Sequence, residues 1–415
     1  MPAPASVVIV GAGHAGCQTA ASLRQFGYTG AITLISDEDE LPYQRPPLSK
    51  AYLLGSLDGR RLLHRQEKWY VDQAVTLLRD AVVSIDRVAR RVVTAGGASV
   101  AYDHLVLATG ARNRPLPVPG AELDGVTGIR RRADADALAP RLRDGARVVV
   151  VGAGFIGLEF AAVAAARGAS VHVVELAERP MGRAVSAPTA ELFRRAHEGW
   201  GVTFDFGHGL ARIVGEHGRV SGVETDDGRM LPAELVVYGI GVLPDTALAE
   251  AAGLAVANGI VVDAALVTSD PDISAAGDAV SFPCAQLGGV LTRLESVQNA
   301  ADQGRHVAAR LMGRADEYRA LPWFWSEQGD LKLQIAGLSQ GCDETVDLAG
   351  GDREKAVLCF QGGVLRAVET VNRPADHMAA RRLLADGPLP AVAEARAAGF
   401  ELAAWEQTQS LAGAR

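Results

Sequence analysis

A short apolar run, a glycine-rich turn and a helical pattern follow one another at the start of the chain. Residues 7–10 are apolar, and apolar positions then recur at helical spacing up to Phe26, where Gly27 closes the pattern. A second apolar run occupies residues 32–35. Short apolar runs separated by a helical pattern are typical of parallel strands joined by a helix. The pattern therefore predicts a strand, a turn, a helix and a second strand.

The same order of patterns recurs in the middle of the chain. Residues 148–151 are apolar, a glycine-rich turn follows, a helical pattern runs to Arg167 and Gly168, and residues 171–174 form the next apolar run. A repeated strand–helix–strand pattern is the signature of open parallel sheets. We therefore predict an α/β fold with two Rossmann-like dinucleotide-binding domains.

Both turns carry the spacing G-x-G-x-x-G, in which each glycine has a physical role. Gly11 makes the tight bend, Gly13 lets the backbone approach a pyrophosphate, and Gly16 lets the helix pack closely on the strand. The pyrophosphate would lie at the positive end of the helix. One such motif is weak evidence, whereas two in the same context predict two nucleotide sites. The glycines of the second turn are Gly152, Gly154 and Gly157.

Each repeat ends its second strand at an acidic residue. Asp37 and Glu175 lie 21 and 18 residues beyond the last glycine of their turns. A carboxylate at this point accepts hydrogen bonds from an adenosine ribose and repels a 2′-phosphate. We therefore expect the second site to prefer NADH to NADPH, although Arg179 and Arg183 follow closely and could favour a phosphate.

Length and composition predict an ordinary soluble protein of several domains. The chain has 415 residues, more than one typical domain, and its 48% hydrophobic and 22% charged residues are close to globular averages. No stretch approaches the roughly 20 consecutive apolar residues of a membrane span. Residues 1–6 lack the basic region of a secretory signal. We therefore expect a cytoplasmic protein.

The charge and the cysteines argue against other classes of function. A net charge of −8 without long basic runs is unfavourable for binding nucleic acid or an anionic membrane. The cysteines are scattered without C-x-x-C spacing, so we expect reduced thiols, no disulfide framework and no metal site. They are Cys17, Cys284, Cys342 and Cys359.

With both repeats placed, the chain resembles the FAD-dependent pyridine nucleotide-disulfide reductase superfamily. Within it, the chain is similar to the NADH-dependent ferredoxin reductases of the putidaredoxin reductase type, which serve bacterial haem monooxygenases and ring-hydroxylating dioxygenases. The resemblance begins near Ser6 and extends into the last hundred residues. The motifs that carry it are RPPLSK at 45–50, ATG at 108–110, AGDA at 276–279, ESV at 295–297 and WFWS at 323–326.

The resemblance implies three domains and two cofactors, FAD and NADH. A discontinuous FAD-binding domain would comprise residues 1–110 and 242–318, and an NADH-binding domain residues 111–241. A C-terminal α+β domain, residues 319–415, would cover one face of the flavin. The FAD-binding residues carried over by motif are Gly11, Gly13, His14, Ala15, Asp37, Arg45, Lys50, Val83, Ala108, Thr109, Gly110, Arg132, Asp278, Ser296, Val297 and Trp325. Those of the second site are Gly152, Gly154, Ile156, Gly157, Glu159, Glu175 and Gly241.

Some of these residues have more specific implied roles. Val83 would meet the adenine through its backbone, and Lys50 and Arg132 would lie along the cofactor. Asp278 would bind the ribityl and pyrophosphate region, although as bare sequence it could instead cap a helix. The N–H of Val297 would face the pyrimidine ring of the flavin.

Three residues are expected to be catalytic. Lys50 would place a positive charge near the flavin and stabilise its anionic reduced form, with Glu159 as its ion-pair partner. Glu159 is expected on the first turn of its helix, where a carboxylate also suits the helix dipole without any catalytic role. Trp325 would shield the flavin and shorten the electron path. Its alternation with Trp323 predicts two indoles on one side of a strand, and a buried core pair is the alternative explanation.

The expected chemistry needs positioning and charge compensation and no acid–base triad. Glu295 could hydrogen-bond the nicotinamide carboxamide or form an ordinary surface ion pair. Superfamily members that reduce disulfides carry a redox cysteine in the stretch that is here residues 43–47, where no cysteine is present. We therefore expect electrons to pass directly from FAD to an external acceptor.

The resemblance implies that this acceptor is a 2Fe-2S ferredoxin, bound transiently by a monomeric reductase. Family ferredoxins are acidic, so docking needs a local basic face on this acidic chain. Each candidate basic segment could also be an ordinary solvated surface. The candidates are Arg60-Arg61 with Arg65 and Lys68, Arg305 with Arg310 and Arg314, and Arg373 with Arg381-Arg382.

Two alternatives to ferredoxin reduction remain open at this point. One is an NADH reductase with another acceptor, such as rubredoxin, a nitrite-reductase partner or a small organic radical. The other is a nonenzymatic flavoprotein that resembles apoptosis-inducing factor, because a fold alone does not determine function.

Overall fold

The computed structural model describes residues 3–315 and 317–413. Its contacts divide the chain into two compact units. The first compact unit comprises Met1–Arg45, Gly59–Arg112 and Val242–Ala320. The second comprises Pro46–Asp58, Asn113–Gly241 and Leu321–Arg415.

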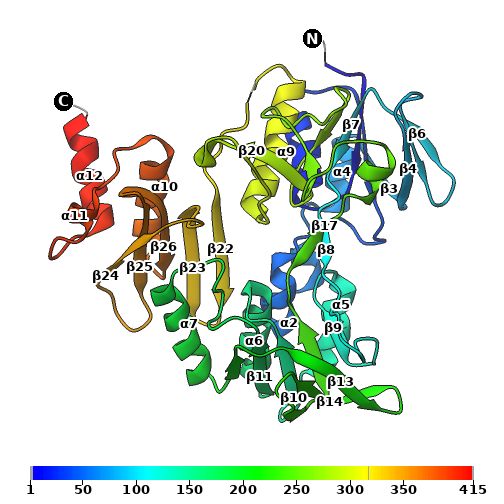
Figure 1. The fold of residues 1–415 in the computed structure, drawn as a ribbon. Coiled ribbons are helices and arrows are strands. Elements are labelled where there is room, and N and C mark those ends of the chain that lie inside the picture. Colours follow the sequence, from blue (N-terminus) through cyan, green and yellow to red (C-terminus); the bar gives the residue numbers. More distant parts are fainter. Residues whose placement is uncertain (1–2, 316, 414–415) are drawn as a thin grey trace. The chain divides into compact units, whose positions relative to one another are not determined.

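The first compact unit is built on a parallel sheet with the strand order β19-β7-β1-β2-β3 (Figure 1). Strand β1 pairs with β2 on one edge and with β7 on the other, and its last four residues are buried. A central parallel strand covered on both faces needs apolar residues at successive positions, which explains the continuous apolar run. The strands are β1 (Ser6–Val10), β2 (Ala31–Ser36), β3 (Val75–Arg79), β7 (His104–Leu107) and β19 (Ile273–Ala275).

Helix α1 (His14–Gln25) follows β1 and packs on α9 (Val297–Leu311). The helices approach closely because Gly304 lacks a side chain: a Cβ atom there would lie 2.4 Å from the backbone oxygen of Ala15. The other elements of the first compact unit are α3 (Gly59–Leu62), α4 (Glu67–Asp72), β4 (Val82–Asp86), β5 (Arg91–Thr94), β6 (Ser99–Ala101), β17 (Val242–Pro244), α8 (Ala247–Ala251), β18 (Ile260–Val261), β20 (Val280–Cys284), η3 (Ala285–Leu287) and β21 (Val290–Thr292). Strand β8 (Ala111–Asn113) begins in the first unit, and its last residue is assigned to the second.

The second compact unit contains another parallel sheet, with the strand order β12-β11-β10-β16-β9. Its core includes Val149, Val151, Val174 and Val236. The strands are β9 (Val126–Gly128), β10 (Arg147–Val151), β11 (Ser170–Glu175), β12 (Thr203–Phe206) and β16 (Leu235–Tyr238). Accompanying elements are η1 (Pro46–Ser49), α2 (Ala51–Leu54), α5 (Arg132–Leu138), η2 (Ala139–Arg141), α6 (Phe155–Ala166), α7 (Ala187–Gly199), β13 (Leu210–Glu216), β14 (Arg219–Thr225) and β15 (Met230–Pro232).

The same unit contains an antiparallel sheet with the strand order β22-β23-β26-β25-β24 (gold to orange in Figure 1). Helix α10 packs on this sheet and on α12, and Leu358, Val368, Leu383 and Leu402 belong to the core between them. The elements are β22 (Trp323–Gln328), β23 (Leu331–Gly337), β24 (Glu344–Leu348), β25 (Lys355–Gln361), β26 (Val364–Val371), α10 (Pro374–Asp386), α11 (Val392–Ala395) and α12 (Leu402–Gly413).

Two parallel sheets and a C-terminal α+β layer confirm the predicted fold class. The four strands expected at residues 7–10, 32–35, 148–151 and 171–174 are all present. In the described part of the chain no helix is long and apolar enough to cross a membrane.

The structure differs from the predicted domains at residues 46–58, which we assigned to the FAD-binding domain. They belong by contacts to the second compact unit, where η1 packs on α6 and α2 packs on α5. The other domain boundaries stay predictions, and the outermost ends at residues 1 and 415 lie outside the described residues.

Candidate functional site

The first glycine turn has the geometry that a dinucleotide pyrophosphate requires. Gly11 has a φ of +104°, and a Cβ atom there would lie 2.2 Å from the backbone oxygen of Ala108. A Cβ atom on Gly16 would lie 1.9 Å from the backbone oxygen of Gly11. By contrast, a Cβ atom on Gly13 would meet nothing within 4 Å. Packing inside the protein does not explain the glycine at position 13, and the open space suits a phosphate group.

The N-terminus of α1 points to the same use. The helix begins at His14, and the preceding Gly13 offers no side-chain cap. The first N–H groups of a helix have no acceptor within the helix itself, and an anion is favoured at this end. Asp37 is exposed and directly follows β2. These residues fit the ADP portion of FAD.

Two further predicted segments lie at element ends of the first compact unit. Thr109 follows β7 and donates its hydroxyl hydrogen to the backbone oxygen of Asp245 at 2.6 Å, and Gly110 has a φ of +70°. Ser296 caps α9 by accepting from the N–H of Asn299 at 3.0 Å. Val297 is the first residue of this helix, so its N–H is one of the groups without an intrahelical partner.

The remaining predicted FAD residues are not brought together within one unit. Val83 lies on β4 with a relative exposure of 55%. Arg45 forms an ion pair with Glu38 at 2.6 Å. Arg132 belongs to the second compact unit, where its Nε donates to the hydroxyl of Tyr52 at 3.1 Å. Their contacts with FAD stay predictions.

The second glycine turn repeats the geometry of the first. Gly152 has a φ of +97°, and a Cβ atom on Gly157 would lie 2.2 Å from the backbone oxygen of Gly152. A Cβ atom on Gly154 would have its nearest neighbour at 3.6 Å, the backbone oxygen of Gly239. Ile156 is the second residue of α6, and Gly241 has a φ of +99°. The residues present fit a second dinucleotide.

The carboxylate of Glu175 is fixed at the end of β11. It accepts from the backbone N–H of Ala153 at 2.6 Å and of Ala177 at 2.8 Å. The nearby guanidinium of Arg179 donates to the backbone oxygens of Val185 at 2.9 Å and of Gly182 at 3.0 Å. Arg179 is therefore engaged with the backbone, and Arg183 is exposed.

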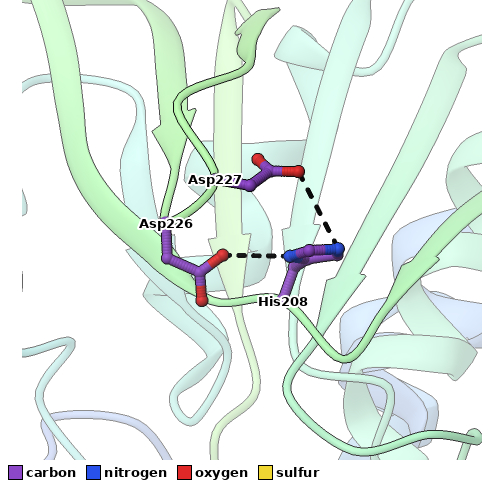
Figure 2. A group of neighbouring side chains, drawn as sticks. All are labelled: His208, Asp226 and Asp227. Atoms are coloured by element: carbon purple, nitrogen blue, oxygen red, sulfur yellow. Dashed lines mark hydrogen bonds and ion pairs between the residues drawn. The ribbon is translucent and has the colours of Figure 1, made fainter.

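More acidic groups lie near this end of β11. The backbone N–H of His208 donates to the backbone oxygen of Glu175 at 3.2 Å. Figure 2 shows the His208 ring between two carboxylates: Nδ1 is 3.1 Å from Asp226 and Nε2 is 3.8 Å from Asp227. The three side chains could supply ligand atoms within 4.8 Å of one another. They are exposed or half-exposed, and Asp227 also pairs with Arg229 at 2.7 Å, so polar contacts among the described residues account for the cluster.

The predicted ion pair between Lys50 and Glu159 is present. Lys50 Nζ lies 2.8 Å from Glu159 Oε2, and the two side chains are 16% and 5% exposed. Ser49 donates to the same oxygen at 2.6 Å. The expectation that Glu159 lies on the first helical turn is wrong, because α6 begins at Phe155 and Glu159 is its fifth residue. Its buried contacts, and not the helix dipole, account for this carboxylate.

Strand β22 presents different residues on its two faces. Trp323 and Trp325 lie on one face with ring centroids 5.5 Å apart, as the alternation predicts. Both indoles are half-buried, which does not favour the fully buried core pair. On the other face, the rings of Phe324 and Phe155 of α6 are 4.4 Å apart.

Comparison with known proteins agrees with this geometry. Residues 5–304 match the model of the pyridine nucleotide-disulphide oxidoreductase family, and residues 323–405 match a reductase C-terminal domain. The chain belongs to the pyridine nucleotide-disulphide oxidoreductase family.

Members of this family resemble the chain over nearly its whole length. Rhodocoxin reductase of Rhodococcus erythropolis is 49% identical over 92% of this chain and 89% of its own length. The ferredoxin reductase of the CYP199A2 system from Rhodopseudomonas palustris is 49% identical with a TM-score of 0.94, covering 97% of this chain and all of the other. The covalent putidaredoxin reductase–putidaredoxin complex matches at 36% identity and a TM-score of 0.94, with 98% and 99% coverage.

The family name refers to disulphides, but this chain has no disulfide among its cysteines. All four thiols are free, as expected from their scattered positions. Cys17, the cysteine nearest the first glycine turn, is buried, and burial raises the pKa of its thiol to about 12. A thiol with so high a pKa is a poor nucleophile at neutral pH.

Asp278, Glu295 and Arg310 have surroundings that decide between their expected roles or contradict them. Asp278 is not a helix cap, because it lies in a turn between β19 and β20. Glu295 forms an ion pair with Arg293 at 2.5 Å, which supports the surface ion pair as its role in this structure. Arg310 is wrong as an exposed docking residue, because it is partly buried and donates to the hydroxyl of Ser274 at 2.6 Å.

Sequence reasoning missed the serines that bind Glu159. Ser326 donates to Glu159 Oε1 at 2.7 Å, and Ser49 donates to Oε2. Both serines belong to motifs shared with the family, Ser49 to RPPLSK and Ser326 to WFWS, but no role was predicted for either. One signal in the sequence could have indicated them. Ser326 and Gln328 follow Phe324 at every second position, so two polar side chains share one face of a strand with an aromatic residue and need buried partners there.

Proposed function

We propose that this protein is an NADH-dependent ferredoxin reductase. In the net reaction, one NADH and two oxidised ferredoxins give NAD⁺, one proton and two singly reduced ferredoxins. The observation that carries the proposal is the presence of two complete dinucleotide turns in a chain whose described cysteines are all unpaired. Bound FAD would supply the chemistry by accepting two electrons as a hydride and releasing them one at a time.

The chain's own residues would bind the cofactors and compensate charge. We propose that the first turn, with Asp37, Asp278 and the N-terminus of α9, holds FAD, and that the second turn with Glu175 holds NADH. Lys50 would stabilise the negative charge of the reduced cofactor and Glu159 would hold Lys50 in place. Trp325 would shield the flavin, and the first turn's His14 and Ala15 would supply backbone N–H groups.

The experiment that tests the function is stopped-flow absorbance of the purified yellow protein. NADH should bleach the flavin rapidly, and a 2Fe-2S ferredoxin should then restore the oxidised spectrum. If NADH bleaches the flavin and rubredoxin reoxidises it but ferredoxin does not, the acceptor is another protein than a ferredoxin. Absence of bleaching would contradict the enzyme assignment and favour a nonenzymatic flavoprotein.

Coenzyme preference should depend on Glu175. Replacing it with alanine removes a carboxylate that would accept charge-assisted hydrogen bonds from the ribose, each worth about 1.5–3 kcal/mol. We therefore expect kcat/KM for NADH to fall by about tenfold or more, since 1.4 kcal/mol is a factor of ten. Activity with NADPH should rise, because a negative charge is removed beside the 2′-phosphate. Steady-state kinetics with both coenzymes measure the ratio.

The neighbouring Glu178→Gln variant is the matched control for Glu175→Ala. Glu178 is exposed and lies three residues further along the chain. The Glu178→Gln variant should leave the ratio of kcat/KM for NADH to kcat/KM for NADPH unchanged. An equal change in both variants would contradict a specific role for Glu175 and indicate a general effect of the local field.

We propose that the basic segment formed by Arg60, Arg61, Arg65 and Lys68 receives the acidic ferredoxin. All four side chains are exposed. In the second segment Arg310 is turned inward and Arg314 donates to the backbone oxygen of Phe26 at 2.9 Å. In the third, Arg382 pairs with Glu406 at 2.7 Å, as Lys68 does with Asp72 at 2.7 Å in the first, so the choice rests on the exposure of all four side chains. Opposite charges on two docking faces accelerate association and orient the partners.

Reversing two charges on this segment should slow ferredoxin reduction. We expect Arg60→Glu with Arg61→Glu to lower kcat/KM for ferredoxin by about tenfold at low salt and to weaken its salt dependence. Reduction of ferricyanide should be unchanged. The control is Arg212→Glu with Arg219→Glu, an equal charge change on exposed residues of β13 and β14. A similar loss in the control would show that net charge, and not this segment, determines the rate.

A 2Fe-2S cluster in the partner, transient binding, a monomeric state and a cytoplasmic location complete the proposal. Size-exclusion chromatography with light scattering of the reductase alone and with ferredoxin tests the monomer and the weak complex.

A further inference from the structure

A buried row of hydrogen bonds joins strand β22 to the carboxylate of Glu159. Ser326 donates to Glu159 Oε1 at 2.7 Å, and Gln328 Nε2 donates to the Ser326 hydroxyl at 3.3 Å. The ring nitrogen Nε2 of His197 on α7 lies 2.9 Å from Gln328 Oε1. Ser326, Gln328 and His197 have no exposed surface, and Glu159 is 4% exposed. Buried polar groups in such a row are strongly coupled because no water competes for their hydrogen bonds.

The donors in this row all point toward Glu159. Burial lowers the pKa of His197 to about 4, so the ring is neutral at pH 7 and carries one hydrogen. This hydrogen is on Nε2, which faces an amide oxygen. The hydroxyl group of Ser326 has a single hydrogen to donate, and an ionised carboxylate can only accept hydrogen bonds. The hydroxyl therefore donates to Glu159 and accepts from Gln328. The row therefore ends on a negative charge that it stabilises.

The other carboxylate oxygen of Glu159 has donors as well. Ser49 donates to Oε2 at 2.6 Å, and Lys50 Nζ lies 2.8 Å from the same atom. All of these contacts are donors, which is what a buried ionised carboxylate requires. The negative charge of Glu159 is thus compensated by Lys50 and by two hydroxyl donors. Without one of these hydroxyl donors, the negative charge of Glu159 would be less compensated. It would then offset more of the positive charge of Lys50.

We propose that Ser326, supported by Gln328 and His197, is a positioning residue that sets how strongly the negative charge of Glu159 offsets the positive charge of Lys50 at the flavin. Strand β22 of the C-terminal domain would in this way tune the redox potential of the bound FAD. The inference rests on the proposed function, in which Lys50 stabilises the reduced cofactor. Without the Ser326 hydroxyl, the Glu159 charge is less compensated, and the anionic reduced cofactor is disfavoured.

The test measures the midpoint potential of FAD in the holoenzyme, by equilibrium titration against reference dyes. Ser326→Ala should shift the two-electron equilibrium about tenfold toward oxidised FAD, a potential about 30 mV more negative. Ser326→Thr retains the hydroxyl and should restore the wild-type value. The matched control is Ser339→Ala, a half-buried serine of the same domain whose hydroxyl donates to the backbone oxygen of Ala184 at 3.5 Å. It should not change the potential.

A double-mutant cycle with Glu159→Gln separates positioning from a general structural effect. The single Glu159→Gln change removes the negative charge and should make the potential more positive. In that background Ser326→Ala should add no shift, because there is no carboxylate charge left to compensate. Equal negative shifts in both backgrounds would overturn the proposal. Gln328→Met provides a second variant if Ser326→Ala loses FAD, with a smaller shift of the same sign expected, and no shift in it would overturn the proposal.

The outcomes also distinguish this inference from the proposed function. An unchanged potential in Ser326→Ala, with a clear shift in Glu159→Gln, would overturn the inference and leave the function intact. An unchanged potential in Glu159→Gln would overturn the role of the Lys50–Glu159 pair and the inference with it. Failure of NADH to reduce wild-type FAD would overturn the proposed function itself.

Discussion

Lys50→Met should slow the reduction of bound FAD by NADH about 100-fold, the usual cost of removing one preorganised electrostatic contact. The side chain is only 16% exposed, so its charge acts in a region where water provides little screening. Methionine preserves much of the length and apolar volume of lysine. FAD should remain bound, because the predicted ADP contacts lie in the first glycine turn. Stopped-flow absorbance after mixing with NADH measures the rate.

The same variant should also be less stable. Glu159 is 5% exposed on its side chain and would lose the cation that pairs with it, while keeping the hydroxyl donors Ser49 and Ser326. Leaving a buried charge unpaired costs about 3 kcal/mol or more. Adding Glu159→Gln to Lys50→Met should recover most of this stability without recovering the rate. Urea unfolding, followed by flavin fluorescence and circular dichroism, measures the difference.

An exposed lysine provides the control for Lys50→Met. Lys68 is 82% exposed on its side chain and pairs with Asp72 at 2.7 Å. Lys68→Met should change stability by less than about 1 kcal/mol, because exposed ion pairs contribute little. Its rate of flavin reduction should be that of the wild type. A Lys50→Met protein that is reduced at the wild-type rate would contradict the electrostatic role of this residue.

Gly13→Ala and Gly154→Ala should separate the two cofactor sites. Chain neighbours aside, a methyl group on Gly13 meets none of the described residues within 4 Å, and one on Gly154 has its nearest neighbour at 3.6 Å. Both variants should therefore fold normally. Gly13→Ala should bind FAD about 100-fold more weakly, since small displacements at a reacting or binding centre have effects of this size. Gly154→Ala should retain FAD and lose rapid reduction by NADH.

The contrast with neighbouring glycines makes this prediction specific. Gly11→Ala and Gly157→Ala would place a Cβ atom 2.2 Å from a backbone oxygen, so both should lose stability directly. Thermal unfolding of the apoproteins distinguishes these cases from Gly13→Ala. If Gly13→Ala bound FAD as tightly as the wild type, the open space beside Gly13 would not be the pyrophosphate site. If Gly154→Ala were reduced normally by NADH, the second turn would not bind this coenzyme.

Local patterns predicted the two parallel sheets well. Continuous apolar runs such as residues 7–10 and 148–151 are typical of strands covered on both faces, and the following glycines at fixed spacing leave few alternatives. The positions of Asp37 and Glu175 followed from the same short-range rule. The acids and glycines lie within about forty residues of one another in each repeat, so their arrangement is largely local.

Contacts between distant segments were harder to predict. The motif that contains Lys50 was assigned to the FAD-binding domain, yet its residues 46–50 belong to the second compact unit, where η1 packs with α6 and α5. The pair Lys50–Glu159 was expected from the resemblance to known reductases, whereas the place of Glu159 on its helix was wrong by one residue. Arg310 was expected on the surface because nothing in the sequence revealed the hydroxyl of Ser274 that it contacts.

The sequence by itself determined the fold class, the two nucleotide-binding turns and the absence of a cysteine in residues 43–47, because each depends on residue type at short and fixed spacing. Only the tertiary structure decided what surrounds Glu159. Ser49, Lys50, Ser326, Gln328 and His197 come from segments up to 279 residues apart in the chain. They meet because η1 and β22 pack on α6, and because α7 packs on β25, a strand of the same sheet as β22. Burial turns ordinary serines into required hydrogen-bond donors, and burial is a property of the packed chain.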